Sequence, residues 1–225
     1  MSLDIQQITV PFVPGTTVNC YLVKSSDAFV LVDTGPARQR AYIQAALQKA
    51  GCRPDNFKLI VLTHGDFDHC GNAAFLAKTY KVPIAMHTAD LGMVKDGNML
   101  AGRKQPNIVM KTLIRSLMRL SRINRFTPDI FIKEGDSLAE HGFDADVIEI
   151  PGHSSGSVGL LTQQGELLCG DLLGNTKKPD LWSIMDDVDT AKASLRKLAG
   201  HAIKKVYPGH GQPFNMEYFW DNYSY

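Results

Sequence analysis

Ligand-type side chains are concentrated in the stretch "LTHGDFDHCGN", residues 62–72. It places His64, Asp66, Asp68 and His69 within six consecutive positions. Imidazole nitrogens and carboxylate oxygens bind zinc and similar divalent ions, with about four ligands to each ion. In a loop that leaves a strand, His64 and Asp66 can converge on one ion while Asp68 and His69 face a second. The stretch therefore predicts a metal site.

Three more candidate ligands lie far along the chain, each beside a glycine after an apolar run. His153 lies in "IEIPGHSSGS", His210 in "VYPGHGQP", and Asp171 follows the predicted strand "ELLCGD". Proline fixes the chain direction at both "PGH" turns, and glycine permits the tight bend. The two histidines would complete two ligand sets, and the Asp171 carboxylate could bridge both ions, which leaves an open position for water.

The elements that must position these residues follow from hydrophobic patterning. The runs "TVNCYLVKS" and "AFVLVDTG" predict a hairpin with its turn at 25–27, and residues 37–50 predict a helix that stops at Gly51. "FKLIVLTH" is an almost continuous apolar strand that ends at the first candidate ligands. "NAAFLAKTY" then predicts a helix and "VPIAMHT" a strand. This alternation favours an α/β layered fold.

The second half of the chain begins with a different kind of segment. We expect a helical insertion at about 104–126, whose residues 107–125 place apolar side chains on one face and basic ones on the other. It could pack on the domain with a solvated basic face, cover the site, or form a dimer contact. "DIFIKEG", "DADVIEIPGH", "SVGLLTQQGELLCGD" and "KKVYPGHG" predict strands, and "DDVDTAKASLRKLAG" predicts a helix. We expect a single domain over 1–225.

Composition narrows the classes of protein. The net charge is +1, which gives no general attraction to nucleic acid, and no run of about 18 apolar residues predicts a membrane span. The N-terminus lacks the pattern of a signal peptide. The four cysteines form no C-x-x-C pair, so reduced thiols and a cytoplasmic protein are expected. We expect burial for Cys70 and Cys169, and structural or surface roles for His87, His141 and His201.

The order of motifs resembles a known family. "VLVDTG", "THGDFDHCGN", "PGHSSGS", "GD" and "PGHG" follow one another as in the metallo-β-lactamase superfamily of hydrolases, and this resemblance spans residues 33–210. Within the superfamily, the substrate class is expected by analogy with the glyoxalase II-like branch. The resemblance implies an α/β four-layer αβ/βα sandwich with two metal ions at the edge of its sheets. It implies His64, Asp66 and His153 at the first ion, Asp68, His69 and His210 at the second, Asp171 between them, and Asp33 in support.

One position departs from the family pattern H-x-H-x-D-H, because Asp66 stands where the second histidine belongs. Aspartate is a harder, anionic ligand. We therefore expect two divalent ions, with Zn²⁺ favoured but Mn²⁺ or Fe²⁺ made more plausible. A third carboxylate should also make the local field less positive.

The resemblance implies a metal-dependent hydrolase whose hydroxide, held between two metal ions, attacks a small ester, thioester or lactone. Asp68 is the candidate catalytic residue, because it could hold the hydroxide while binding metal. The expected partner is a small-molecule substrate, with no nucleic acid or membrane, and a homodimer remains open. The alternatives are an iron-dependent oxidoreductase similar to persulfide dioxygenases, a phosphodiesterase or β-lactamase, and a non-catalytic metal-binding protein.

Overall fold

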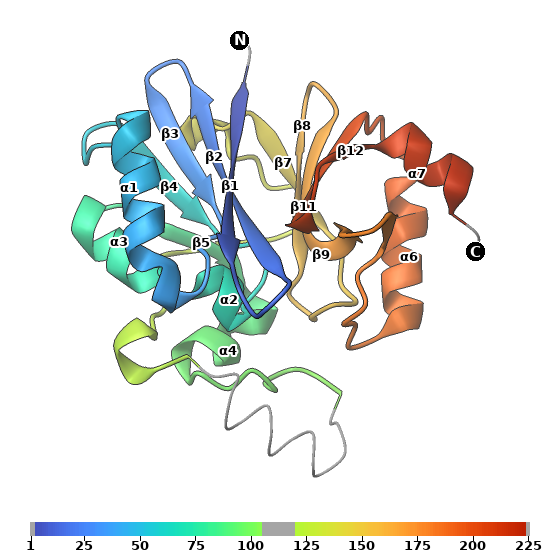
Figure 1. The fold of residues 1–225 in the computed structure, drawn as a ribbon, viewed down its shortest axis with the longest axis horizontal. Helices are drawn as coiled ribbons and strands as arrows, with labels where there is room; N and C mark the ends of the chain where they lie inside the picture. The colour runs from blue at the N-terminus through green and yellow to red at the C-terminus, as the bar shows by residue number, and fades with distance from the viewer. Residues whose placement is uncertain (1–2, 105–119, 224–225) are drawn as a thin grey trace.

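Two β-sheets face each other at the centre of the structure, a computed structural model that describes residues 3–104 and 120–223. Figure 1 shows helices α1 and α3 on the outer side of one sheet and α6 and α7 on the outer side of the other. This arrangement is the predicted four-layer αβ/βα sandwich, so the predicted fold class is confirmed.

The first sheet has the strand order β1-β2-β3-β4-β5-β6, antiparallel from β1 to β3 and parallel from β3 to β6. Its strands are β1 (Asp4–Pro11), β2 (Thr17–Ser25), β3 (Ala28–Val32), β4 (Phe57–Val61), β5 (Ile84–His87) and β6 (Ile130–Ile132). The predicted hairpin is β2–β3, and Ser26 turns it with a φ of 52°. The sequence analysis missed β1, an edge strand that buries only Ile8 and Val10.

The second sheet has the order β12-β11-β9-β8-β7, with β10 paired to β9. Its strands are β7 (Ala145–Glu149), β8 (Val158–Thr162), β9 (Glu166–Asn175), β10 (Pro179–Leu181), β11 (Lys205–Gly211) and β12 (Phe214–Asn215). All of its pairs are antiparallel except β9 and β11, which run parallel. The ring of His69, shortly after β4, lies 5.5 Å from that of His210 near the end of β11, so the carboxyl ends of these two strands meet between the sheets.

The α-helices of the described residues are α1 (Arg40–Ala50), α2 (Phe67–Cys70), α3 (Ala73–Tyr80), α4 (Leu91–Lys95), α6 (Val188–Leu198) and, after the last strand, α7 (Met216–Asn222). Short 3₁₀ turns are η1 (Ala37–Gln39), η2 (Thr88–Asp90), η3 (Arg122–Asn124) and η4 (Ala139–His141). The predicted first helix is η1 followed by α1, and Gly51 ends it in the left-handed region.

Three buried clusters hold the layers together. Val32 and Val61 meet Leu160 and Leu168 between the sheets. A second cluster joins the first sheet to α1 and α3, and a third joins the second sheet to α6 and α7. The aromatic C-terminal segment therefore packs on the core through Met216 and Phe219 of α7.

The expected insertion at about 104–126 falls largely on residues 105–119, which lie outside the described residues. Its described end comprises buried Leu120 and the η3 turn. Within the described residues, none of the helices is both long and apolar enough to cross a membrane.

A buried amide joins the two sheets close to the candidate ligand His210. The Asn19 side chain on β2 donates to the Pro208 carbonyl at 2.9 Å and to the Gly211 carbonyl at 2.7 Å. Its oxygen accepts from Gln7 and Thr9 on β1, each at 2.9 Å. Asn19 thus fixes the β11 backbone on both sides of His210 relative to the first sheet.

We predict that Asn19→Leu lowers the free energy of unfolding by about 2–3 kcal/mol, because it removes the hydrogen bonds that the buried amide donates to the Pro208 and Gly211 carbonyls and accepts from Gln7 and Thr9. Urea denaturation measures this change. The matched control is Asn222→Leu, the same substitution at an exposed amide, which should change stability by less than about 0.5 kcal/mol. Equal effects of the two substitutions would contradict the role given to Asn19.

Candidate metal centre

The stretch 62–72 bends sharply as it leaves β4. His64 lies three residues after the strand, Asp66 takes the N-cap position of α2 with extended backbone, and Asp68 and His69 lie in the single turn of that helix. His64, Asp68 and His69 are buried, and the Asp66 side chain is 13% exposed. The strand-loop-helix geometry thus directs all four predicted ligands toward the space between the sheets.

Asp171 and His210 reach the same space from within strands, whereas the sequence analysis placed them in turns after strands. β9 continues to Asn175, and the β9–β11 register shifts at Pro208 and again before His210. Gly170 has a φ of +49°, a backbone geometry that favours glycine. A side chain at Gly209 would place its Cβ against Asp171 Oδ1. These irregularities, which no periodic pattern reveals, turn the two side chains inward.

The first predicted ligand set comes together around one oxygen of Asp66. His153 Nε2 lies 2.8 Å from Asp66 Oδ2, and His64 Nε2 lies 3.7 Å from it. The same oxygen accepts a hydrogen bond from Arg103 Nη2 at 2.9 Å. The sequence analysis did not select Arg103, which arrives from the segment after α4.

The second predicted set surrounds Asp68. Its Oδ2 lies 3.8 Å from His210 Nε2 and 4.0 Å from His69 Nε2. Asp171 lies within reach of both sets, 3.4 Å from His69 Nε2, 3.2 Å from His210 Nε2 and 3.9 Å from His153 Nε2. The carboxylate between the sets is therefore the one predicted to bridge two ions.

The donor atoms fit divalent ions. Bonds of about 2.0–2.1 Å in a tetrahedral site place neighbouring donors about 3.3 Å apart, and the separations here run from 2.8 to 4.0 Å. Among the described residues, His64 Nε2, His69 Nε2 and Asp171 Oδ1 are buried without a hydrogen bond. Buried polar atoms are rarely left unsatisfied, so these inward-facing atoms suit a metal.

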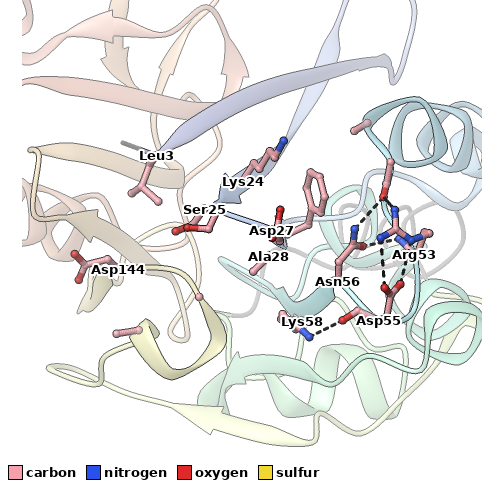
Figure 2. A pocket seen from close by; sticks show the side chains of 16 residues that line it. Leu3, Lys24, Ser25, Asp27, Ala28, Arg53, Asp55, Asn56, Lys58 and Asp144 are labelled. Atoms are coloured by element: carbon pink, nitrogen blue, oxygen red, sulfur yellow. Dashed lines mark hydrogen bonds and ion pairs between the residues drawn. The ribbon is translucent and has the colours of Figure 1, made fainter. Parts of the chain in front are cut away.

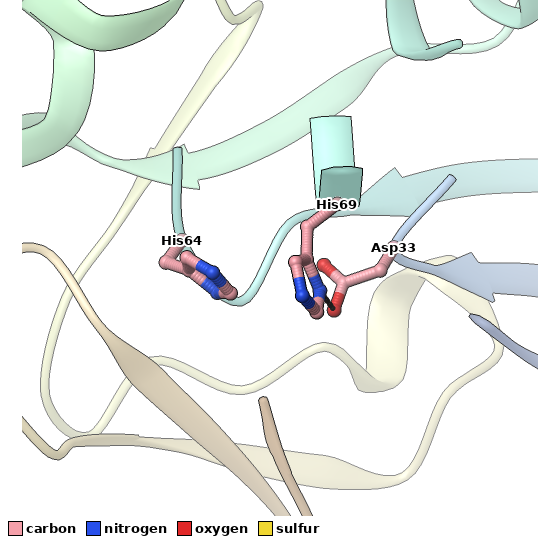
Figure 3. Close-up of side chains that lie close together, drawn as sticks. All are labelled: Asp33, His64 and His69. Carbon is pink, nitrogen blue, oxygen red and sulfur yellow. Dashed lines mark hydrogen bonds and ion pairs between the residues drawn. The ribbon is translucent and has the colours of Figure 1, made fainter. Parts of the chain in front are cut away.

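The opposite sides of the imidazoles are held by hydrogen bonds. His69 Nδ1 contacts Asp33 Oδ2 at 2.9 Å, as Figure 3 shows, and Asp33 also accepts from the backbone and hydroxyl of Thr63. His153 Nδ1 meets the Ile184 carbonyl, and His210 Nδ1 meets a carbonyl of β2. Such contacts fix the ring orientation and direct Nε2 toward the metal.

Asp33, His64 and His69 also lie close enough to form a ligand set of their own. The Asp33 oxygens, however, are already engaged by His69 Nδ1 and by Thr63, and His64 Nδ1 lies 2.9 Å from the Thr63 hydroxyl. Asp33, with a φ of 60°, therefore supports the imidazoles from behind, as the resemblance implied.

A second supporting carboxylate, Asp90, escaped the sequence analysis. It is fully buried and accepts from the Gly65 amide, the Ser154 hydroxyl and the Gly156 amide at 2.7–2.9 Å. Those donors flank the candidate ligands of the first set, so Asp90 ties together the two loops that carry it. By contrast, His87 contacts Glu149 at 3.2 Å, outside the centre.

Charge sharing shifts the pKa values of the imidazoles. Burial lowers the pKa of His64, and the neighbouring imidazoles lower it further, so this residue is a neutral donor. At His69, His153 and His210 burial acts in the same direction, but nearby carboxylates outweigh it and raise each pKa. In the metal-free protein these three rings therefore hold protons more tightly than free histidines do.

An indole covers the second ligand set. The Trp182 ring stacks on His210 with the ring centroids 4.3 Å apart and the planes 3° from parallel. The Trp182 amide donates to the Leu172 carbonyl, and Gly174 lies so close that a Cβ there would touch the indole. Trp182 therefore restricts rotation of the His210 imidazole.

A hollow of about 1010 Å³ lies away from this centre. It is lined by Lys24 and Ala28 at the β2–β3 turn and by Arg53 and Asn56 before β4, as Figure 2 shows. Arg53 pairs with Asp55 there. The hollow is at the amino ends of β3 and β4, whereas the candidate ligands follow the carboxyl end of β4, so it offers no binding space beside them.

This fold, with candidate metal-ligand sets gathered between its two sheets, is the one expected of a class of metal-binding hydrolases. The profile described as the metallo-beta-lactamase superfamily matches residues 13–210, and the chain belongs to that superfamily.

Among its relatives, the acyl-coenzyme A thioesterase MBLAC2 of Bos taurus is 26% identical, with 90% of this chain and 76% of the relative covered. The hydroxyacylglutathione hydrolase GloC of Haemophilus influenzae is 25% identical, with 79% and 77% covered. The crystal structure of TTHA1623 in a di-iron-bound form superimposes with a TM-score of 0.71 at 26% identity, covering 93% of this chain and 95% of the other.

We predict that metal binding releases protons, because His69, His153 and His210 have raised pKa values. Affinity should therefore fall as the pH falls through those raised values. At pH 7, three histidines of ordinary pKa 6.5 would release about 0.7 proton together. We expect more than about one, measured by titration calorimetry in buffers of different ionisation enthalpy. A release at or below the ordinary value would contradict the shifts.

We predict that Trp182→Leu weakens metal binding at the second set about threefold to tenfold, because the stacking that orders His210 is lost. Trp182 and Trp220 are the chain's two tryptophans, so Co²⁺ should quench Trp182 emission in the wild type and in Trp220→Phe. If Co²⁺ quenched tryptophan emission in Trp182→Leu as strongly as in the wild type, the quenched indole would be Trp220, and Trp182 would not lie beside the metal-binding residues.

Proposed function

We propose that the protein is a metal-dependent hydrolase that uses two divalent ions to cleave a small ester, thioester or lactone. One observation carries this proposal: two His/Asp ligand sets share Asp171, with buried imidazole nitrogens that face inward without hydrogen bonds. The ligands would be His64, Asp66 and His153 for one ion, Asp68, His69 and His210 for the other, and Asp171 for both.

When bound, the ions would polarise the substrate carbonyl and acidify a water molecule. The residues of the chain have to hold the metal-binding atoms in place and accept the proton that the water loses. The first task falls to Asp90 and to the groups behind the imidazoles, Asp33 and backbone carbonyls. Zn²⁺, Mn²⁺ and Fe²⁺ all suit this mixture of nitrogen and oxygen donors, and Zn²⁺ is our first choice.

Asp68 is the residue we assign to the proton. Burial raises the pKa of its carboxyl, and the carboxylates of Asp66 and Asp171 act in the same direction, while His69 opposes them. A carboxylate with a raised pKa is a stronger base. Asp68 also faces Asp171 across the rings of His69 and His210, so it borders the space where water would be activated.

Thioesters are the substrates we favour. Two relatives carry the names acyl-coenzyme A thioesterase and hydroxyacylglutathione hydrolase, in which an acyl group is attached to a thiol carrier. A hollow of about 420 Å³ opens beside Arg103 and the residues that flank His153, and it offers space close to the first ligand set. No serine or cysteine nucleophile is required, because the attacking group is water.

We also propose a cytoplasmic location. Cys20, Cys52, Cys70 and Cys169 are all buried free thiols, as reduced proteins commonly have. The expected burial of Cys70 and Cys169 is confirmed.

We predict that Asp68→Asn reduces kcat/KM for the best substrate at least a hundredfold, because the amide can neither accept the proton nor supply an anionic ligand. The assay is a panel of acyl-coenzyme A, acylglutathione, lactone and aryl ester substrates on protein with a measured metal content. The matched control is His87→Gln, which alters a half-buried histidine outside the centre and should retain activity.

Other activities would be recognised in the same experiment. Turnover of a phosphodiester, a β-lactam or a persulfide in place of carboxylic esters would overturn the proposed substrate class. Metal-stripped protein that keeps full activity would overturn the metal-dependent reaction itself. Metal binding with no turnover of any substrate would indicate a binding protein.

A further inference from the structure

Arg103 places a positive charge beside Asp66, the carboxylate that would bind the first ion. Its Nη2 donates to Asp66 Oδ2 at 2.9 Å, and the two side chains are 14% and 13% exposed. That oxygen also meets His153 Nε2. An ion held by this set would therefore share Asp66 with a guanidinium.

The arginine is held in place by its backbone. The Lys104 amide donates to both oxygens of Asp186 at 2.8 and 3.0 Å, and the Ala101 amide donates to the Asn98 carbonyl at 2.8 Å. Gly102 has a φ of +73°, and a Cβ there would lie 2.9 Å from the Ser155 hydroxyl. These contacts tie the turn of Arg103 to the loop that carries His153, so the guanidinium is a built part of the centre.

The charge of Arg103 is secure in this position. Burial alone would lower its pKa, but Asp66 outweighs that effect, with further contributions from Asp90 and Asp186. A guanidinium stays protonated at any ordinary pH.

The two ligand sets consequently differ in charge. In the first, His64 and His153 are neutral donors when they bind metal, and the Asp66 charge is compensated by Arg103. In the second, the ion pairs of Asp68 within the described residues are with His210 and His69, at 3.8 and 4.0 Å, and no guanidinium is among them, while Asp171 is shared by both sets. A dication is attracted by an uncompensated carboxylate and repelled by a nearby guanidinium. The electrostatics therefore favour the second set.

We propose that Arg103 is a fixed counter-cation of the first ligand set, which makes the two metal sites unequal so that a divalent ion fills the second set first. The inference rests on the metal centre of the proposed function, but it concerns metal affinity and requires no turnover. Arg103 stabilises the Asp66 carboxylate in the metal-free protein, and its positive charge weakens the binding of a metal ion to the same carboxylate.

The test is a titration of metal-free protein with Zn²⁺ by calorimetry and with Co²⁺ by visible absorption. Wild-type protein should bind two ions in steps that differ at least tenfold in affinity. His210→Gln should remove the tight step and His153→Gln the weak one, which assigns each step to its set.

Arg103→Gln should strengthen the weak step at least tenfold, while Arg103→Lys, which keeps the charge, should stay closer to the wild type. The matched control is Arg125→Gln, at an arginine whose Nε donates to the Leu120 carbonyl; it should leave both steps unchanged. Equal affinities in the wild type, or a weak step that Arg103→Gln does not alter, would overturn the assignment. Unchanged metal binding with a raised KM for a carboxylated thioester would identify Arg103 as a substrate contact instead.

A second pair of variants keeps the test decisive if Arg103→Gln folds poorly, because Asp66→His removes the buried carboxylate that would otherwise lose its partner. Asp66→His restores the common family ligand but leaves Arg103 facing a neutral ring, so Asp66→His with Arg103→Gln should bind the first ion at least tenfold more tightly than Asp66→His alone. Equal binding would overturn the role of Arg103. Wild-type protein that binds no divalent ion would overturn the proposed function as well.

Discussion

Asp171 is the carboxylate around which the buried polar groups of this protein are arranged. Its oxygens face His69 and His210 from the second ligand set and His153 from the first. Charged groups removed from water are stable only when they are paired and hydrogen-bonded. Each of these imidazoles is accordingly fixed from behind, by Asp33 or by a backbone carbonyl. The centre is thus a connected network in which the position of each ligand depends on a partner outside it.

Both sheets contribute candidate ligands to this network, so the packing of one sheet against the other determines whether the ligands come together. The first sheet supplies its candidate ligands through the turn after β4, and the second supplies His153 through the loop between β7 and β8 and the other two through backbone irregularities in β9 and β11. Gly209 allows β11 to approach Asp171, and Asn19 holds β11 against β2 from the other side. Packing between the sheets and ligand geometry are therefore coupled.

The ordered motifs were enough to predict the fold and the residues that gather at the centre, because metal ligands belong to few residue types and recur beside glycine and proline. Other features have no such signal. β1 is an edge strand with few buried side chains. Asp171 and His210 lie in irregular strands, since a register shift leaves no periodic trace. Arg103, Asp90 and Trp182 belong to no recognisable motif, and the partners that place them at the centre lie more than 20 residues away in the chain, so only the folded structure identifies them.

Arg103 changes the net charge that Asp66 brings to the centre. When the candidate ligands alone are counted, a third carboxylate makes the centre more negative than the usual histidine-rich pattern. The guanidinium returns one positive charge at 2.9 Å, so the Asp66–Arg103 pair carries the same net charge as a neutral histidine. The overall charge at the two sites is then close to that of the common pattern, while its distribution is less even. In the proposed two-metal centre, Asp66 would therefore alter the relative affinity of the two sites more than the acidity of water between them, because that acidity would follow the summed field and the affinity the nearest charges.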